Sequence, residues 1–160
     1  MSLLKPYKYV KKVSDISLNM LVLWDVKAIL LDTDNTLAPR DSEFFSSETR
    51  EWIDKAKKIF GMCIVSNGRP GRVRRASQIF DIPYVYPPFK PFPGTFRKAA
   101  SLLGVKTADC VMIGDQVFTD VLGGNLAGMK TILVDPVDSQ SDGFWTKLLR
   151  RIERRLGVRG

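Results

Sequence analysis

The chain has 160 residues and a mass of 18.0 kDa, which suits one domain with a buried core and leaves little room for a second. Hydrophobic residues make up 44% and charged residues 26% of the sequence, so the composition excludes a disordered or fibrous protein. The formal net charge of +8 favours an anionic partner, such as a lipid, a nucleic acid or a phosphorylated substrate, or serves solubility alone.

The sequence contains no stretch typical of a membrane span or a secretory signal. The apolar runs 20–24 and 28–31 are far shorter than the ~20 residues needed to cross a bilayer. Cys63 and Cys110 lie in apolar runs, where cysteines are usually buried thiols. Both observations predict a cytoplasmic protein and leave open a peripheral contact with the inner face of the membrane.

Apolar and basic residues alternate in the N-terminal segment, 1–25, which we expect to precede a domain at 26–160. Its lysines include Lys5, Lys8, Lys11 and Lys12. Such a segment is either a solvated arm or a surface that lies on an anionic membrane, since basic residues near acidic lipids are worth about 1 kcal/mol each. The residues alone leave both interpretations open.

Strand-like and helix-like segments then alternate along the chain. The expected strands are 27–31, 62–66, 84–86, 110–113 and 131–134, and the expected helices are 46–60, 70–80, 95–103, 118–127 and 144–156. This order predicts an α/β fold, a single Rossmann-like three-layer domain with a mainly parallel five-stranded sheet. Ligands bind such sheets at the carboxyl ends of the strands, so the residues that follow each strand matter most.

Two carboxylates follow the first of these strands. Asp32 and Asp34 are one residue apart, so the first can face a phosphorus atom while the second approaches the leaving oxygen. Acidic residues are also common in ordinary turns. The pair alone therefore leaves a catalytic and a structural role open.

The next two loops offer groups that suit a phosphate. Ser66 and Asn67 follow the second strand, where exposed amides can hold an anion or simply cap the next helix. Lys90 lies in a proline-rich loop after the third strand, and the prolines stiffen its backbone. A lysine fixed there can neutralise phosphoryl oxygens and nearby aspartates, although a lone lysine in a loop is more often solvated.

A second pair of carboxylates, Asp115 and Asp120, follows the fourth strand at the same edge of the expected sheet. Clustered carboxylates attract a cation, and oxygen ligands with open positions suit Mg²⁺. The sequence has no histidine for a nitrogen-rich zinc site. We therefore expect Mg²⁺ as the cofactor.

Together these groups resemble the four ordered motifs of the haloacid dehalogenase-like (HAD) superfamily of phosphatases. The matching residues are Asp32-Thr33-Asp34-Asn35-Thr36, Ser66-Asn67, Lys90-Pro91 and Gly114-Asp115 through Asp120. The resemblance covers residues 28–134 and implies a HAD-like fold. Within the superfamily, the short chain and its basic N-terminal segment resemble the capless bacterial phosphatidylglycerophosphate phosphatase family.

The resemblance implies a role for each carboxylate. Asp32 is expected to attack phosphorus and form an aspartyl-phosphate, while Asp34 acts first as acid and then as base. Mg²⁺ is expected on Asp32, on the main-chain carbonyl of Asp34 and on Asp115. Asp120 is expected to act behind these ligands, by orienting a water or Lys90.

The phosphate-binding residues implied by the resemblance are Ser66, Asn67 and Lys90. Asp34 also favours a phosphatase over a dehalogenase, because an alkoxide leaving group needs an acid and a halide does not.

The intervals between the motifs hold no separate cap domain, which predicts an open site for a phosphate displayed on a large substrate. From the resemblance we expect a phospholipid substrate, phosphatidylglycerophosphate, hydrolysed to phosphatidylglycerol at an anionic membrane surface, with no nucleic-acid partner. One alternative is a phosphatase of soluble phosphomonoesters or nucleic-acid ends. Another is a non-catalytic basic module that binds membranes or RNA and carries a relict site.

The last predicted helix, 144–156, is basic and amphipathic. Its apolar side chains lie along one face and its basic side chains gather across from it. We expect the apolar face to pack against the sheet, as in most amphipathic helices, with membrane contact as the alternative.

Overall fold

The computed structural model describes residues 2–42, 44–140 and 142–158. Its centre is a five-stranded sheet in the order β1-β5-β4-β2-β3, in which every neighbouring pair is parallel. The strands are β1 (Lys8–Val10), β2 (Ala28–Leu31), β3 (Gly61–Ile64), β4 (Cys110–Gly114) and β5 (Lys130–Val134). The predicted α/β fold with a parallel five-stranded sheet is confirmed.

One predicted strand, 84–86, is wrong. Tyr84 forms only an isolated bridge with Ile64, and the fifth strand is β1, which pairs with β5 from Lys8↔Ile132 to Val10↔Val134. Pro83 and Pro87 bracket the expected strand and supply no N–H to a ladder, so pairing cannot extend. β1 was missed because it is a short, partly exposed edge strand with little apolar signal.

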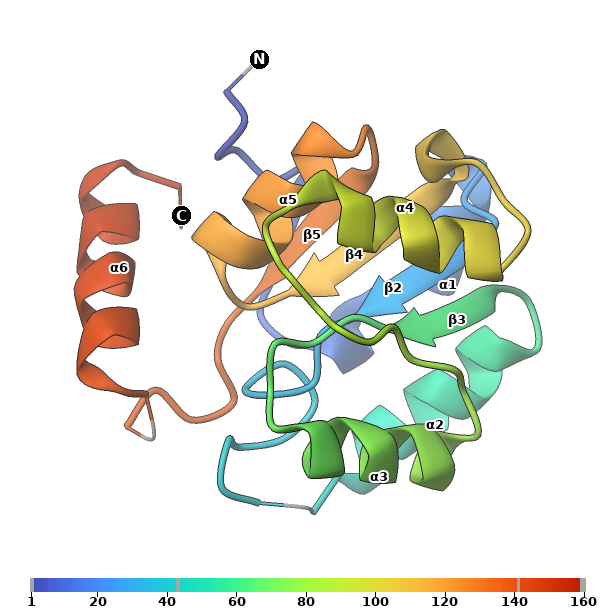
Figure 1. Cartoon of the computed structure of the whole chain (residues 1–160), viewed down its shortest axis with the longest axis horizontal. Helices are drawn as coiled ribbons and strands as arrows, with labels where there is room; N and C mark the ends of the chain where they lie inside the picture. The colour runs from blue at the N-terminus through green and yellow to red at the C-terminus, as the bar shows by residue number, and fades with distance from the viewer. Residues whose placement is uncertain (1, 43, 141, 159–160) are drawn as a thin grey trace.

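Helices cover both faces of the sheet, with α2 and α3 on one side and α4 and α5 on the other (Figure 1). The helices are α1 (Leu18–Leu23), α2 (Ser47–Lys57), α3 (Pro70–Phe80), α4 (Pro93–Leu102), α5 (Leu122–Leu126) and α6 (Phe144–Arg155). Ser46 caps α2 by accepting from the Thr49 amide, while Pro70 and Pro93 open their helices. A wide helical turn, Val117–Val121, takes the place of the first part of the helix predicted at 118–127.

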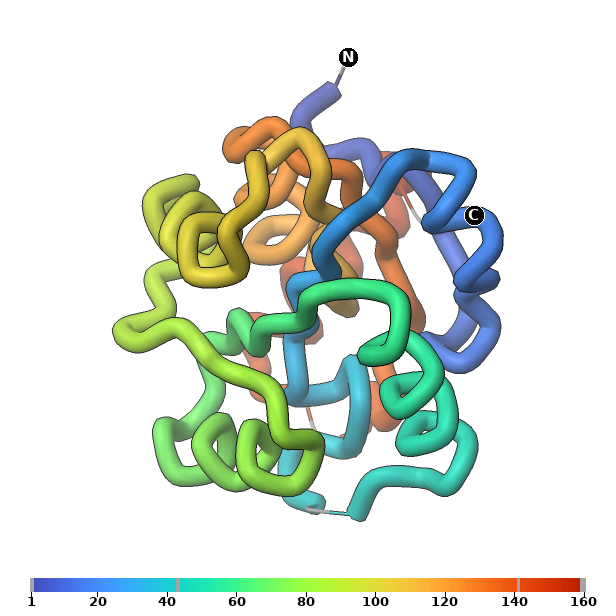
Figure 2. The backbone as a smooth tube through the Cα atoms, turned by 90° about the vertical axis from the view of Figure 1, so that its right-hand side faces the viewer, coloured from blue at the N-terminus to red at the C-terminus, as the bar shows by residue number. Residues whose placement is uncertain are grey.

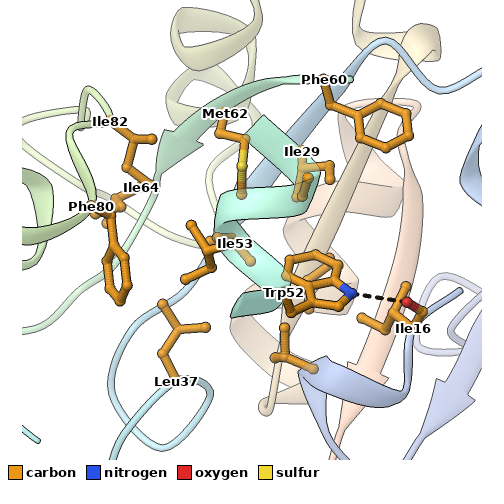
Figure 3. Packing of buried hydrophobic residues seen from close by; sticks show 14 of the residues in the cluster. Ile16, Ile29, Leu37, Trp52, Ile53, Phe60, Met62, Ile64, Phe80 and Ile82 are labelled. Carbon is orange, nitrogen blue, oxygen red and sulfur yellow. Dashed lines mark hydrogen bonds between the residues drawn. The ribbon is translucent and has the colours of Figure 1, made fainter. Parts of the chain in front are cut away.

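The larger core lies between the sheet and α1, α2 and α3. Trp52 and Ile53 of α2 point into it, and Phe80 of α3 closes one end (Figure 3). The indole N–H of Trp52 donates to the carbonyl oxygen of Ile16 at 2.9 Å, so α2 holds the N-terminal segment in place. A second core, with Phe96 of α4 at its centre, fills the opposite face.

The N-terminal segment is folded back against the body of the molecule (Figure 2). The Tyr7 amide donates to the Thr131 carbonyl at 2.9 Å, and the Tyr9 hydroxyl donates to Asp135 at 2.6 Å. Residues 7–10 are therefore part of the sheet edge and not a solvated arm.

The last helix, α6, has the predicted position but not the predicted orientation. Its apolar side chains face outward, with Phe144 75% and Trp145 73% exposed, while Arg150 and Glu153 are buried. The expectation that its apolar face packs against the sheet is wrong. The reason is electrostatic, because Arg150 turns inward to pair with carboxylates that are themselves buried.

Candidate active site

The residues that follow β2, β3 and β4 meet at the carboxyl edge of the sheet, beside the loop that carries Lys90. Asp32 continues β2, since its amide donates to the Ile113 carbonyl at 3.0 Å. The Thr33 hydroxyl donates to Ser66 Oγ at 2.9 Å, which joins the first two motifs. The resulting pocket has a volume of about 80 Å³ and is lined by Asp32, Asp34, Arg40, Ser66, Asn67, Gly68, Lys90, Gln116 and Thr119.

Lys90 is the buried cation of this pocket. Its Nζ lies 2.9 Å from Asp32 Oδ1 and 2.5 Å from Asp120 Oδ1. Burial alone would lower the pKa of Lys90, but the two carboxylates outweigh burial and raise it. Lys90 therefore stays charged, and it fixes the orientation of the Asp32 carboxylate.

The backbone of Lys90 is held by the loop after β3. The Asn67 side chain donates to the Lys90 carbonyl oxygen and accepts from the Lys90 amide, both at 3.1 Å. The sequence predicts Asn67 as a phosphate ligand. In the structure its side-chain amide instead positions Lys90, and a direct contact between Asn67 and phosphate stays a prediction.

Three buried carboxylates form a cluster that suits a metal ion. Oxygen atoms of Asp32, Asp115 and Asp120 lie within 4.8 Å of one another. The Thr36 hydroxyl is 3.0 Å from Asp32 Oδ2 and 3.1 Å from Asp115 Oδ1, and its single proton cannot serve both. An all-oxygen, strongly anionic donor set of this kind fits Mg²⁺.

The electrostatics of this cluster also indicate a cation site. Burial, reinforced by the charge of Asp32, raises the pKa of Asp115, and the Arg150 guanidinium only partly offsets this. Burial raises the pKa of Asp120 as well, against the lowering effect of Lys90. Both carboxylates are therefore protonated more readily than exposed ones, and a divalent ion would stabilise their charged forms in place of the proton.

Asp34 lies on the other side of the pocket and is bound by Arg72. Arg72 Nε is 3.2 Å from Asp34 Oδ1, and its other nitrogen donates to the carbonyl oxygens of Pro39 and Ser42. Burial and the neighbouring Asp32 raise the pKa of Asp34, and Arg72 moderates the rise. A raised pKa favours the protonated carboxyl group that a general acid requires.

Gly68 leaves the space that Asp34 occupies. A Cβ atom at residue 68 would lie 2.8 Å from Asp34 Oδ2, so a side chain there would displace the carboxylate. Gly114 plays the same part for Asp120, whose Oδ2 is 2.0 Å from the place of a Cβ. Both glycines are needed for close approach and not for an unusual backbone angle.

Arg150, which is the other main cation of the site, could not be identified as a site residue from the sequence. One terminal nitrogen makes a very short ion pair with the Asp115 carboxylate, and the other donates to the Asp115 carbonyl oxygen at 2.9 Å. Its Nε binds Asp142 at 2.5 Å. Arg150 was hidden because it is one of several arginines in a basic helix, and no sequence pattern separates it from its exposed neighbours.

Asn35 connects Asp142, the partner of Arg150, to the loop after β2. Its backbone is left-handed, with φ of 60°, a conformation that asparagine tolerates better than most residues. The Asn35 side chain donates to Asp142 Oδ1 at 2.8 Å and accepts from the Asp138 amide. The segment that leads into α6 is thereby fastened to the loop that carries Asp32 and Asp34.

Comparison with known proteins agrees with this geometry. The HAD-hydrolase-like family model matches residues 89–138, and the mitochondrial PGP phosphatase model matches residues 1–78. The probable phosphatase YqeG of Bacillus subtilis is 41% identical over 94% of this chain and 88% of its own length. The chain belongs to the HAD-like phosphatases.

Two further relatives of this phosphatase are more distant. The chloroplastic and mitochondrial phosphatidylglycerophosphate phosphatase 1 of Arabidopsis thaliana is 26% identical over 94% of the chain and 46% of its own length. The cobalt-bound deoxy-D-mannose-octulosonate 8-phosphate phosphatase of Haemophilus influenzae aligns with a TM-score of 0.57 and 15% identity over 70% of each chain. The second likeness supports the fold alone.

Proposed function

We propose that this phosphatase hydrolyses phosphomonoesters through an aspartyl-phosphate at Asp32, with Mg²⁺ as cofactor, and that its substrate is phosphatidylglycerophosphate. The observation that carries the chemistry is the placement of Asp32 between Lys90 and the Asp115 carboxylate, at the base of a small polar pocket. A nucleophilic carboxylate held by a buried ammonium is pre-oriented for attack.

In the first step, an Asp32 carboxylate oxygen attacks phosphorus and the bond to the ester oxygen breaks. The departing alkoxide takes the proton of Asp34. In the second step, Asp34 removes a proton from water, the resulting hydroxide attacks phosphorus, and the bond to Asp32 breaks to release phosphate. Lys90 and Ser66 neutralise and orient the phosphoryl oxygens in both steps.

Mg²⁺ would be held by Asp32, Asp115 and the Asp34 carbonyl, and would neutralise the charge of the phosphoryl oxygens next to two carboxylates. Asp120 would act through Lys90, whose ammonium it contacts. Thr36, which touches both Asp32 and Asp115, would keep these two side chains in register.

Two observations support a phospholipid substrate. Phosphatidylglycerophosphate is the substrate in the name of the Arabidopsis relative, and the mitochondrial PGP phosphatase family model matches the N-terminal half. Phe89 and Phe92 lie in the loop that carries Lys90, and both are exposed. Exposed apolar side chains on this loop suit a phosphate that is attached to acyl chains and presented at a membrane.

The test is Mg²⁺-dependent phosphate release from phosphatidylglycerophosphate in mixed micelles, with a soluble aryl phosphate in parallel. Because uncatalysed hydrolysis of phosphate monoesters is extremely slow, Asp32→Asn should abolish turnover of both compounds. A fully active Asp32→Asn protein would refute the covalent mechanism. Turnover of the aryl phosphate alone would keep the mechanism and favour soluble phosphomonoesters, and inactivity on both would favour a binding module with a relict site.

A further inference from the structure

The outward face of α6 carries apolar side chains along its length, with the exposed Arg155 among them. The exposed apolar side chains are Phe144 (75%), Trp145 (73%), Leu148 (36%), Ile152 (39%) and Leu156 (56%). Their spacing places them on one side of the helix, at one, four, eight and twelve residues after Phe144. A contiguous apolar strip that a fold leaves in water marks an interaction surface.

Basic side chains border this strip. Lys147, Arg151 and Arg154 are exposed, and together with Phe144 and Leu148 they line a groove of about 460 Å³. Glu153 is the acidic residue of α6, and it is buried on the opposite side. The outward surface of the helix therefore carries positive charge next to apolar side chains.

The inward face of α6 is held by polar contacts at the carboxyl edge of the sheet. Arg150 pairs with Asp115 and Asp142, and Glu153 accepts from the Val117 amide at 3.1 Å. Figure 1 shows α6 on the side towards which the arrowheads of β2 and β4 point. The helix is thus fixed next to the candidate site with its apolar strip turned away from the protein.

We propose that α6 docks on an anionic lipid bilayer, with its apolar strip in the acyl-chain boundary and its basic border among the headgroups. A helix with a strongly basic side and aromatic residues on the other lies in the plane of such an interface. None of the helices in the described ranges is long and apolar enough to cross a membrane.

A second copy of the chain fits this surface less well. In a twofold contact the same patch meets itself, so Lys147, Arg151 and Arg154 of one copy would face the same residues of the other. The described part of α6 exposes no acidic side chain to compensate them. An anionic bilayer supplies the complementary charge.

The experiment is co-flotation of the full chain with vesicles, which measures docking without turnover. The chain should float with vesicles that mix phosphatidylglycerol and phosphatidylcholine, remain behind with phosphatidylcholine alone, and be released by high salt. The double variant Phe144→Ser/Trp145→Ser should bind at least ~10-fold more weakly. Each of Lys147→Ser, Arg151→Ser and Arg154→Ser should weaken binding about 5-fold.

Matched controls replace exposed residues that lie on, or just after, other helices. Ile59 and Leu102 are 54% and 57% exposed, and Ile59→Ser/Leu102→Ser should leave vesicle binding unchanged. Lys55→Ser and Lys58→Ser serve the same purpose for charge. All variants should keep aryl phosphate turnover, so a failure of docking and a failure of the proposed chemistry give different results.

Trp145 provides an independent readout, because its emission should shift to shorter wavelength when phosphatidylglycerol vesicles are added and should be quenched by brominated lipid. Equal binding by the wild type and the double variant would overturn the proposal. So would a dimer in sedimentation experiments that Phe144→Ser/Trp145→Ser dissociates, since that result assigns the strip to a second copy.

Discussion

The single side chain of Lys90 contributes both to the stability of the fold and to the geometry of the candidate site. Its ammonium is buried, compensates two carboxylates, and is aligned through its own backbone by Asn67. Removal of one member of such a buried group leaves the others uncompensated. The stability and the chemistry of the site therefore depend on the same contacts.

The first prediction concerns Lys90→Met. This change should lower the free energy of unfolding by about 3 kcal/mol or more, because Asp32 and Asp120 lose their shared cation, and it should abolish turnover. Urea denaturation and phosphate release measure the two effects. Adding Asp120→Asn should restore part of the stability but none of the activity, and a Lys90→Met protein as stable as the wild type would contradict the pairing.

The surroundings of Arg40 indicate that it can bind an anionic group of a ligand. It lines the pocket, it lies 3.6 Å from Asp142, and its buried Nε has no hydrogen-bond partner in the part of the chain that the structure describes. Buried hydrogen-bond donors seldom lack an acceptor, because a buried donor without one lowers the stability of the fold by about 1–3 kcal/mol. A ligand with a further anionic group would satisfy this nitrogen.

The second prediction is a change in selectivity on Arg40→Met. Phosphatidylglycerophosphate carries a second phosphate and the aryl ester does not, so the ratio of their kcat/KM values should fall about 10-fold or more. Arg69→Met, which removes an exposed arginine from the start of α3, is the matched control. An unchanged ratio would show that Arg40 does not contact the second phosphate.

At the scale of elements, α6 contributes to the site through its polar face. The third prediction is that Arg150→Met lowers the free energy of unfolding by about 3–5 kcal/mol, because Asp115 and Asp142 remain buried without this cation. Chemical denaturation measures the change. Asp142→Asn in the same chain should recover part of it, since the two residues are directly coupled.

The neighbouring Arg151 provides a control for the substitution of Arg150. It is exposed, so Arg151→Met should change the free energy of unfolding by less than about 0.5 kcal/mol. Equal effects of Arg150→Met and Arg151→Met would mean that the ion pairs to Asp115 and Asp142 do not stabilise the fold.

The elements also show where sequence reasoning succeeds and where it stops. The strands β2, β3, β4 and β5 are buried, so their apolar runs are visible in the sequence, and each places its following residues at the predicted edge. The edge strand β1 has no such run, and its pairing depends on β5, more than a hundred residues away. Long-range partners of this kind leave no local pattern.

The same distinction holds for the site. Asp32, Lys90, Asp115 and Asp120 come together as their motifs indicate, because each follows an element that the sequence reveals. Arg150 and Asp142 lie outside those motifs. The predicted orientation of α6 is wrong because an amphipathic pattern shows which side of a helix is apolar, but not which side is buried. In this protein the two ion pairs of Arg150 place the polar side of α6 inward.

At the scale of the whole molecule, charge balance couples stability to pH and metal. Without metal, Asp115 and Asp120 have raised pKa values, so the fold binds protons that the unfolded chain has released. Stability from these groups is complete below the unfolded value of about 4 and is lost as pH rises through the raised values. The metal-free protein should thus lose stability as the pH rises from about 4 to about 8.

The fourth prediction follows from the loss of stability of the metal-free protein as the pH rises. Mg²⁺ bound at the proposed site would take the place of the proton, so the rise in Tm that it causes should be larger at about pH 8 than at about pH 5. Thermal melts in Mg²⁺ and in a chelator measure the difference. Asp115→Asn should reduce the Mg²⁺ effect at the higher pH, and a rise in Tm that is independent of pH would argue against a metal on this carboxylate cluster.

The ion pair between Arg150 and Asp115 also bears on how the protein is made. Asp32, Lys90 and Asp115 are synthesised before residue 150, so the growing chain contains these charges before the arginine that α6 supplies. Domains fold as units during synthesis, from the N-terminal side. The carboxyl edge of the sheet is thus completed only once α6 has been synthesised, when the α6 surface is completed as well.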